Sequence, residues 1–182
     1  VYDEEGDEYN AHVNWGKYNM LRKNTDIAVN EFLNAVQLKD DDIDLLFLLA
    51  GLLTESGETN HAAEYYEKIA KLDPKNKEAL RKLAKFREGI GDYRMQAKYL
   101  EKIVEADSKD LQALKELAKT YEKIKDSDGA IETYNKCLDL ISDPAEIQLI
   151  KSKLEKLESH GSSSVDDSVG LIDKIMGFFN KG

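Results

Sequence analysis

The sequence contains few of the residues that interrupt helices or cross-link chains. Proline occurs twice among 182 residues, at Pro74 and Pro144, and cysteine occurs once, at Cys137. A single cysteine excludes a disulfide within the chain and fits a reducing compartment, so we expect a cytoplasmic protein. The scarcity of proline, together with abundant leucine, alanine, lysine and glutamate, favours an all-helical fold.

Long hydrophobic runs and a positive net charge are also missing. The longest apolar run, Leu45 to Leu53, holds nine residues, whereas a membrane-spanning helix needs about 20. The net charge of −10 gives no overall electrostatic support for binding nucleic acid. An RNA-binding helical repeat, which would depend on scattered lysine and arginine residues, is therefore the least favoured function class.

An internal repeat is what the sequence does contain. Between Ile43 and Asn76, large apolar residues recur at helical spacing, followed by Gly57, a second apolar stretch and Pro74. A shift of 34 residues reproduces this pattern in both directions. In the second half of each period, the large position is occupied by Phe32, Tyr66, Leu100 and Tyr134. Agreement in four registers indicates stacked two-helix units that bury their apolar faces against one another.

This pattern resembles the tetratricopeptide repeat family. The resemblance implies an all-α fold, a right-handed superhelical solenoid of helix-turn-helix repeats, and a role as a protein-interaction scaffold without enzyme activity or cofactor. We place the repeats at residues 9–42, 43–76, 77–110 and 111–144, with a capping helix at 145–159. Outside them, we expect an acidic N-terminal extension at 1–8, a flexible linker at 160–168 and an amphipathic tail helix at 169–182.

Some positions depart from the usual pattern, and others favour turns. Polar side chains replace apolar or small ones at His12, Asn19, Arg87 and Gln96, where we expect altered local packing. Left-handed backbone is expected between the two helices of a repeat, at Asn24, Gly57 and Gly91. The Asp40–Asp42 run lacks calcium-loop spacing and better fits a helix start.

In this family the first helix of each pair lines a concave groove, and the resemblance implies which residues face a ligand. They are Val13, Asn14, Lys17, Phe47, Leu48, Gly51, Arg81, Lys82, Lys85, Lys115 and Lys119. The groove is thus predicted to be apolar in the first two repeats and basic in the last two. The family's carboxylate clamp is not matched, because its positions hold Val13, Lys17, Leu48, Glu78 and Lys82, so we expect no chaperone-tail binding of that kind.

Two features of this groove each allow two interpretations. Phe47 and Leu48 lie on a helix that is apolar on every side, so either they form an exposed binding site or another helix covers them. The basic row either attracts an acidic segment or is a solvated face balanced by nearby glutamates. Those glutamates are Glu78, Glu88, Glu116 and Glu122.

The tail carries apolar residues at helical spacing and is a candidate ligand. They are Leu171, Ile172, Ile175, Met176, Phe178 and Phe179. We expect these residues to bind a groove of the same molecule or, more easily, of a neighbouring molecule, and the second case would give self-association. The alternative is a membrane-tethered adaptor whose tail lies on a lipid surface, although the tail lacks a strongly basic face.

Chemically reactive sets are missing. His12, His61 and His160 are far apart in the predicted stack and form no metal site. Cys137 stands at a small-residue position, where we expect a buried and unreactive thiol. The sequence therefore predicts a binding protein whose partner is a protein or peptide.

Overall fold

The computed structural model describes residues 4–159, and this part of the chain is built from helices joined by short turns. The helices are α1 (Glu4–Leu21), α2 (Thr25–Leu38), α3 (Ile43–Glu55), α4 (Thr59–Leu72), α5 (Lys77–Gly89), α6 (Tyr93–Ala106), α7 (Leu111–Ile124), α8 (Ser127–Leu138) and a further helix over residues 144–159. The expected linker at 160–168 and tail helix at 169–182 lie outside the described residues.

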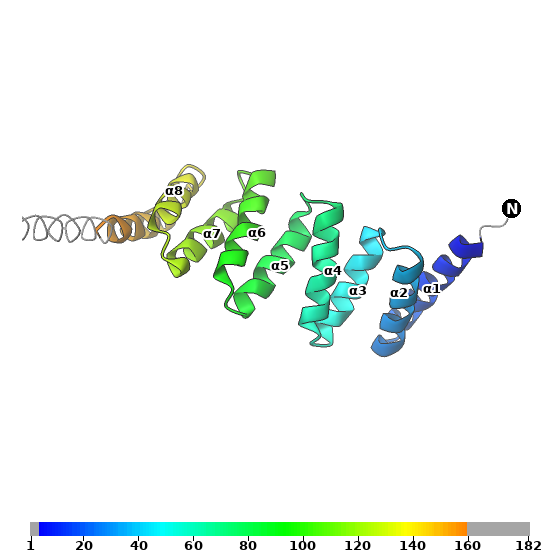
Figure 1. Cartoon of the computed structure of the whole chain (residues 1–182). Coiled ribbons are helices and arrows are strands. Elements are labelled where there is room, and N and C mark those ends of the chain that lie inside the picture. The colour runs from blue at the N-terminus through cyan, green and yellow to red at the C-terminus, as the bar shows by residue number, and fades with distance from the viewer. Residues whose placement is uncertain (1–3, 160–182) are drawn as a thin grey trace, which may run out of the picture. The chain divides into compact units, whose positions relative to one another are not determined.

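The chain divides into two compact units, residues 1–106 and 107–182. In the first unit, α1 packs against α2, α3 against α4 and α5 against α6 (Figure 1). Consecutive pairs are joined because α2 also contacts α3, and α4 contacts α5. The core of this unit consists of residues that recur at the repeat spacing, and its fully buried large members are Phe32, Leu46, Leu49, Ile69, Leu80, Leu83, Leu100 and Ile103.

The N-terminal boundary differs from the sequence-based expectation. Helix α1 begins at Glu4, inside the segment 1–8 that was expected to be an extension. The acidic residues at its start, including Asp7 and Glu8, favour helix because negative charge is stabilised near the positive end of the helix dipole.

A close helix contact distinguishes the first repeat. A Cβ atom added at Gly16 of α1 would lie 2.4 Å from the Phe32 ring of α2. The equivalent position in the next three repeats holds Ala50, Ala84 and Ala118, all of which are buried. Gly16 therefore lets α1 and α2 approach one another around a fully buried aromatic ring.

The turn inside each repeat has one left-handed residue at a fixed register. These residues are Lys23, Gly57, Gly91 and Lys125, each with φ between 61° and 84°. The expectation that Asn24 takes this role was wrong, because Asn24 has a φ of −85° and immediately precedes α2. The 34-residue register thus decides which residue is left-handed, even where a lysine occupies the position.

The first helix of several repeats is capped by an acidic or amide side chain. Asp42 accepts a hydrogen bond from the Leu45 amide at 3.0 Å, and Asn76 and Asp110 cap α5 and α7 in the same way. These caps satisfy backbone amides that lack a partner within the helix. The predicted helix start at Asp40–Asp42 is therefore realised at Asp42.

Three of the four polar residues at apolar or small positions of the pattern find polar partners, whereas the side-chain oxygen of Gln96 is buried without a hydrogen-bond partner among the described residues. Hydrogen bonds join His12 to Glu31 (2.6 Å), Asn19 to the Trp15 carbonyl (2.9 Å), and Arg87 to Glu67 (2.8 Å). Trp15 shares the register of Leu49 and Leu83, yet its side chain is 52% exposed and stacks on Tyr18. The reason is that α3 and α5 pack against a preceding helix, whereas no described helix precedes α1.

In the second unit, α7 packs against α8, and the helix over 144–159 contributes Ile150 and Leu154 to the buried core. Its outward side carries Lys151, Glu155 and Lys156, which are exposed as a capping helix requires. Leu149 is an exception, because its side chain is 62% exposed.

Candidate functional site

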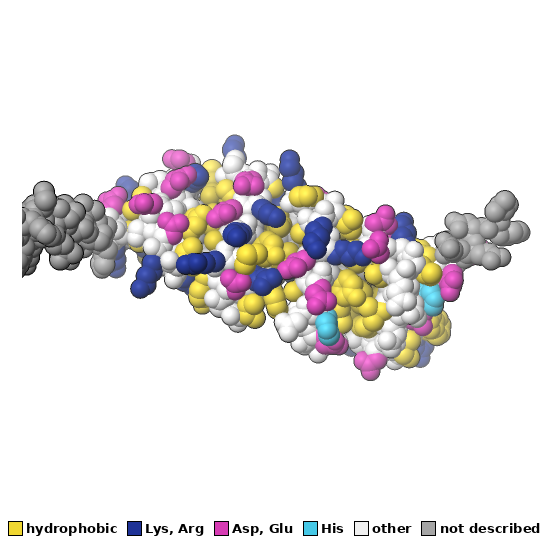
Figure 2. All heavy atoms as spheres, in the orientation of Figure 1, with side chains coloured by type: hydrophobic (Ala, Val, Ile, Leu, Met, Phe, Trp, Pro, Cys, Tyr) yellow, Lys and Arg dark blue, Asp and Glu magenta, His cyan; other side chains and the backbone are white. Residues whose placement is uncertain are grey.

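The apolar residues of the predicted groove come to the surface in the first unit. Phe47, Leu48 and Gly51 lie on α3 and are each partly exposed. The buried side of α3 is occupied by other leucines, including Leu46 and Leu49, so an all-apolar helix leaves some apolar residues facing outward. Figure 2 shows hydrophobic side chains at the surface over the part of this unit where α3 and α4 lie.

These residues line a surface depression that we call the first hollow. It encloses about 450 Å³ between α3, α4 and α5. Its lining residues are Asp44, Phe47, Leu48, Gly51, Tyr66, Glu78 and Lys82. The Phe47 and Tyr66 rings pack at a centroid distance of 6.0 Å. The hollow therefore joins an aromatic floor to two carboxylates and one ammonium group.

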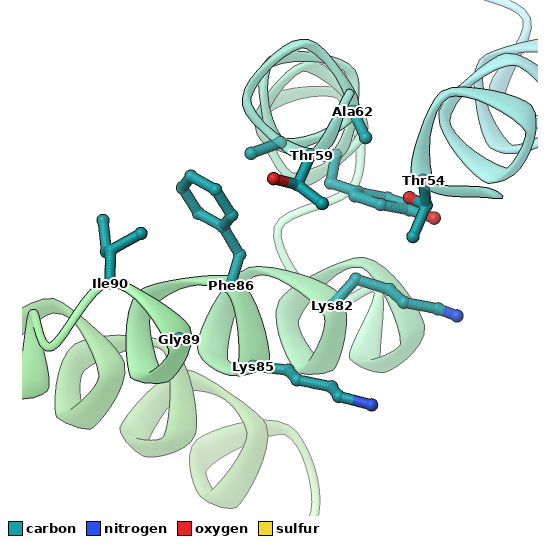
Figure 3. A pocket seen from close by; sticks show the side chains of 10 residues that line it. Thr54, Thr59, Ala62, Lys82, Lys85, Phe86, Gly89 and Ile90 are labelled. Atoms are coloured by element: carbon teal, nitrogen blue, oxygen red, sulfur yellow. The ribbon is translucent and has the colours of Figure 1, made fainter. Parts of the chain in front are cut away.

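A second hollow adjoins the first and shares Tyr66 and Lys82 with it. It encloses about 390 Å³, which is within the range of small-ligand pockets. Its lining residues are Thr54, Thr59, Ala62, Ala63, Tyr66, Lys82, Lys85, Phe86, Gly89 and Ile90. Figure 3 shows Phe86 rising from α5 toward Thr59 of α4, while Lys82 and Lys85 extend together from another side of α5.

The charge of the second hollow has one sign. Lys82 and Lys85 are exposed, lie one helical turn apart on α5, and form no ion pair within residues 4–159. No aspartate or glutamate lines this hollow. Phe86, although apolar, was not among the predicted groove residues. Its register on α5 matches that of the buried Leu52 on α3, so the repeat gave no signal that Phe86 lines a hollow.

The remaining predicted residues of the first unit are placed differently. Val13 is only 9% exposed and belongs to the core, so it offers little surface to a ligand. Asn14 and Lys17 are exposed on α1, and Arg81 is half-buried on α5. None of these residues lines either hollow.

In the second unit, one of the predicted basic residues forms an ion pair within the unit itself. The Lys115 ammonium group contacts Glu146 of the helix over 144–159 at 2.8 Å. Lys119 lies nearby, and both lysines line a hollow of about 140 Å³ together with Tyr134, Glu146 and residues of the terminal helix. Lys115 is therefore neutralised by a glutamate that was not among the four expected to balance the basic row. Extending the 34-residue register beyond residue 144 would have revealed this, because Glu146 then occupies the groove position equivalent to Glu78.

A second buried pairing fixes the terminal helix. Lys153 donates hydrogen bonds to Glu122 at 2.6 Å and to the Tyr134 hydroxyl at 3.0 Å, and Tyr134 donates to Glu122. Burial opposes ionisation of Glu122, but the hydrogen bonds outweigh it and lower the pKa of this carboxyl below its usual value. Burial and the bond to Glu122 raise the pKa of Tyr134 to about 12.

Reactive chemistry is not assembled in the part of the chain that the structure describes. No group of three or more metal-ligating side chains occurs there. Cys137 is buried, and burial raises the pKa of its thiol to about 11, in line with the unreactive thiol predicted from the sequence. Between residues 4 and 159, every helix is too short or too polar to cross a bilayer. The six predicted tail contacts, Leu171 to Phe179, lie outside the described residues.

Comparisons with known proteins agree with this architecture. Models of the tetratricopeptide repeat match residues 43–86 and 111–144. Among solved structures, MamA is 18% identical, with 88% of this chain and 92% of that chain covered and a TM-score of 0.63. MamA from Desulfovibrio magneticus RS-1 is 20% identical, with 88% and 94% covered and a TM-score of 0.60.

A third similar structure is YrrB, described as a TPR protein with an unusual peptide-binding site. It is 18% identical, with 82% of this chain and 76% of that chain covered and a TM-score of 0.59. No curated protein sequence matches the chain. Residues 43–86 and 111–144 are therefore tetratricopeptide repeats, and the chain shares the helical fold of these solved structures.

Proposed function

We propose that this chain is a protein-interaction scaffold and that the two hollows between α3, α4 and α5 bind an amphipathic segment of a partner. The observation that carries the proposal is the open apolar surface around Phe47 and Leu48, continuous with a second hollow through Tyr66 and Lys82. Apolar patches that remain open on a folded surface commonly mark binding sites. The peptide-binding description of YrrB, a protein of similar fold, supports the same class of function.

The geometry suits a segment with apolar side chains on one face. An amphipathic helix laid in a groove presents anchors three or four residues apart, and an extended peptide presents them at alternate positions. The two hollows lie side by side, so neighbouring anchors of one segment fit one into each. Each anchor that becomes fully buried contributes about 1.5–3 kcal/mol.

The tail of residues 169–182 is the first ligand to test, because its composition fits this surface. Its six apolar side chains would contribute roughly 9–18 kcal/mol on full burial, against roughly 10–20 kcal/mol for ordering about ten residues. These terms nearly cancel, so we expect the free tail peptide to bind weakly. Tethering of the tail to the chain, which supplies an effective concentration of about millimolar, should then favour the bound state.

The test is a titration followed by fluorescence anisotropy. A labelled peptide of residues 164–182 is titrated with a chain ending at residue 160, whose helical content is first compared with that of the full chain by circular dichroism. We expect saturable binding that is weakened at least tenfold by Phe47→Glu with Leu48→Glu. The control is Ile27→Glu with Leu72→Glu, which alters two apolar residues that are more exposed than Phe47 and Leu48, at 45% and 44%, and that lie outside both hollows.

Four outcomes are distinguishable. Loss of binding only in the Phe47 and Leu48 variant supports the proposed surface, whereas equal loss in the control variant indicates general damage to the fold. Binding that survives both variants places the site elsewhere. If no binding occurs and the full chain, unlike the shortened one, sediments with liposomes, the membrane-tethered adaptor is the better description.

A further inference from the structure

The two hollows differ in charge, and this difference gives the surface a direction. The second hollow presents the ammonium groups of Lys82 and Lys85 and no carboxylate. The first hollow presents Asp44 and Glu78 on the side away from Lys85, with Lys82 shared between the hollows. A ligand that lies across both hollows therefore meets positive charge at one end and mainly negative charge at the other.

The lysines of the second hollow differ from most of those that line the hollow of the second unit. There, Lys115 is held by Glu146 and Lys153 by Glu122, and Lys119 alone forms no ion pair within residues 4–159. Lys82 and Lys85 have no such partner among the described residues, although the whole chain has 36 acidic and 26 basic side chains. In an acidic protein, two neighbouring cations left without carboxylates beside an apolar floor favour an acidic ligand.

The apolar part of the second hollow is well formed. Its floor contains the buried side chains of Ala62, Ala63 and Tyr66, and its rim contains Ile90, which is 57% exposed. Phe86 rises between the rim and α4 (Figure 3). A large aliphatic side chain can enter this volume while a carboxylate on a neighbouring residue reaches Lys82 or Lys85.

The sequence after residue 160 has the matching order of charges. Residues 165–173 contain Asp166, Asp167 and Asp173, four aliphatic side chains and no basic residue. Residues 174–182 contain Lys174 and Lys181, four large apolar side chains and no acidic residue. The charge therefore changes sign near the middle of this segment, as it does between the two hollows.

We propose that residues 165–182 occupy this surface in one direction, with 165–173 over the second hollow and 174–182 over the first. This inference rests on the proposed function and specifies its ligand and orientation. In this direction the aspartates approach Lys82 and Lys85, and the tail lysines approach Asp44 and Glu78. The reverse direction would place carboxylates of the tail against those of the first hollow.

The direct test is zero-length cross-linking of the full chain with a carbodiimide, which joins a lysine amine to a carboxylate as an amide. Peptide mapping by mass spectrometry should find Asp166, Asp167 or Asp173 linked to Lys82 or Lys85. Exposed and unpaired lysines of α6, at positions 98 and 102, serve as the internal control. Mixing ¹⁵N-labelled with unlabelled chains shows whether the linked segment belongs to the same molecule or to a second copy.

The complementary links test the direction separately. Lys174 or Lys181 should be joined to Asp44 or Glu78 in the same sample. The proposed orientation is overturned if the aspartates of the tail are linked equally to the control lysines. It is also overturned if the tail lysines are linked to sites away from the first hollow. Both patterns are read from wild-type protein, so they do not depend on the folding of a variant.

Affinity measurements separate this inference from the proposed function. Lys82→Gln with Lys85→Gln should weaken binding of the 164–182 peptide roughly three- to tenfold at low salt, the size expected for two partly exposed ion pairs. The matched control, Lys98→Gln with Lys102→Gln, should leave the affinity unchanged. A peptide with its three aspartates changed to lysine should recover affinity for the Lys82→Glu, Lys85→Glu variant.

Each result leads to a different conclusion. If the peptide binds and the Phe47 and Leu48 variant abolishes binding, but neither lysine variant nor salt has an effect, the proposed function stands and the charge-directed orientation is rejected. If neither binding nor specific cross-links are found, the tail is not the ligand, and both proposals are rejected for this segment.

Discussion

The contact between Gly16 and Phe32 gives the sharpest prediction about stability. In Gly16→Ala the new methyl group would lie 2.4 Å from the Phe32 ring, whose side chain is fully buried. Carbon atoms pack at about 3.5–4.0 Å, so the ring and α1 must separate by about 1 Å. Such overpacking costs about 1–3 kcal/mol, whereas replacing a helical glycine by alanine gains about 1 kcal/mol. We expect a net destabilisation of up to about 2 kcal/mol.

The matched control is Gly51→Ala on α3. An added Cβ at Gly51 has no heavy atom within 4 Å, so only the helix-propensity gain of about 1 kcal/mol should appear. The free energies of unfolding of the two variants should therefore differ by about 1–3 kcal/mol, with Gly16→Ala the less stable. This comparison keeps the chemical change constant and varies only the space around it.

Urea unfolding followed by tryptophan fluorescence is the suitable assay. Trp15 is the single tryptophan of the chain and lies on α1, so its signal reports the repeat that contains Gly16. Circular dichroism at 222 nm then reports helices over the whole chain, and the two probes need not agree in a repeat protein. If unfolding followed by Trp15 fluorescence shows that Gly16→Ala is as stable as Gly51→Ala, the packing argument is refuted. Adding Phe32→Leu to Gly16→Ala should reduce the cost of the first change.

Three further predictions concern turns, protonation and the thiol. Lys125 has a left-handed φ of 62°, which glycine adopts without strain, so Lys125→Gly should stabilise the second unit by about 1 kcal/mol in urea unfolding. By the same reasoning, Gly91→Ala should destabilise the first unit by about 1 kcal/mol. Hydrogen bonds in the folded state lower the pKa of Glu122, so its ionised form contributes to the free energy of unfolding above its ordinary pKa of 4.5, and this contribution is lost as the pH falls through the lower folded pKa. Over that acidic range, Glu122→Gln should therefore lose less thermal stability than the unaltered chain. Cys137 should react with a thiol reagent at pH 8 only as fast as the protein unfolds, because it is buried and its pKa is raised to about 11, and rapid reaction of the folded chain would contradict this.

Several features of the fold followed from the sequence because they depend on a repeated local pattern. The 34-residue register located the buried positions Phe32, Tyr66, Leu100 and Tyr134 from spacing alone, and the aspartate run indicated the helix start that Asp42 caps. The all-apolar pattern of the helix that carries Phe47 and Leu48 left open whether these side chains are exposed or covered by another helix.

Other features could not be predicted from one repeat at a time, since they depend on which neighbour a helix has. Trp15 occupies the register of a core leucine, yet it remains half-exposed because no described helix precedes α1. Lys115 occupies a groove position, yet Glu146 of the terminal helix neutralises it.

What the sequence by itself determined is therefore the repeat, its register and the residue types that the register places on each helix. What only the tertiary structure decided is which of those residues stay accessible. Lys82 and Lys85 differ from Lys115 because no carboxylate of the described chain forms an ion pair with them, and Phe86 lines a hollow although it was not among the predicted groove residues. The physical reason is that accessibility and ion pairing depend on distances between different helices, which periodicity along one helix does not specify.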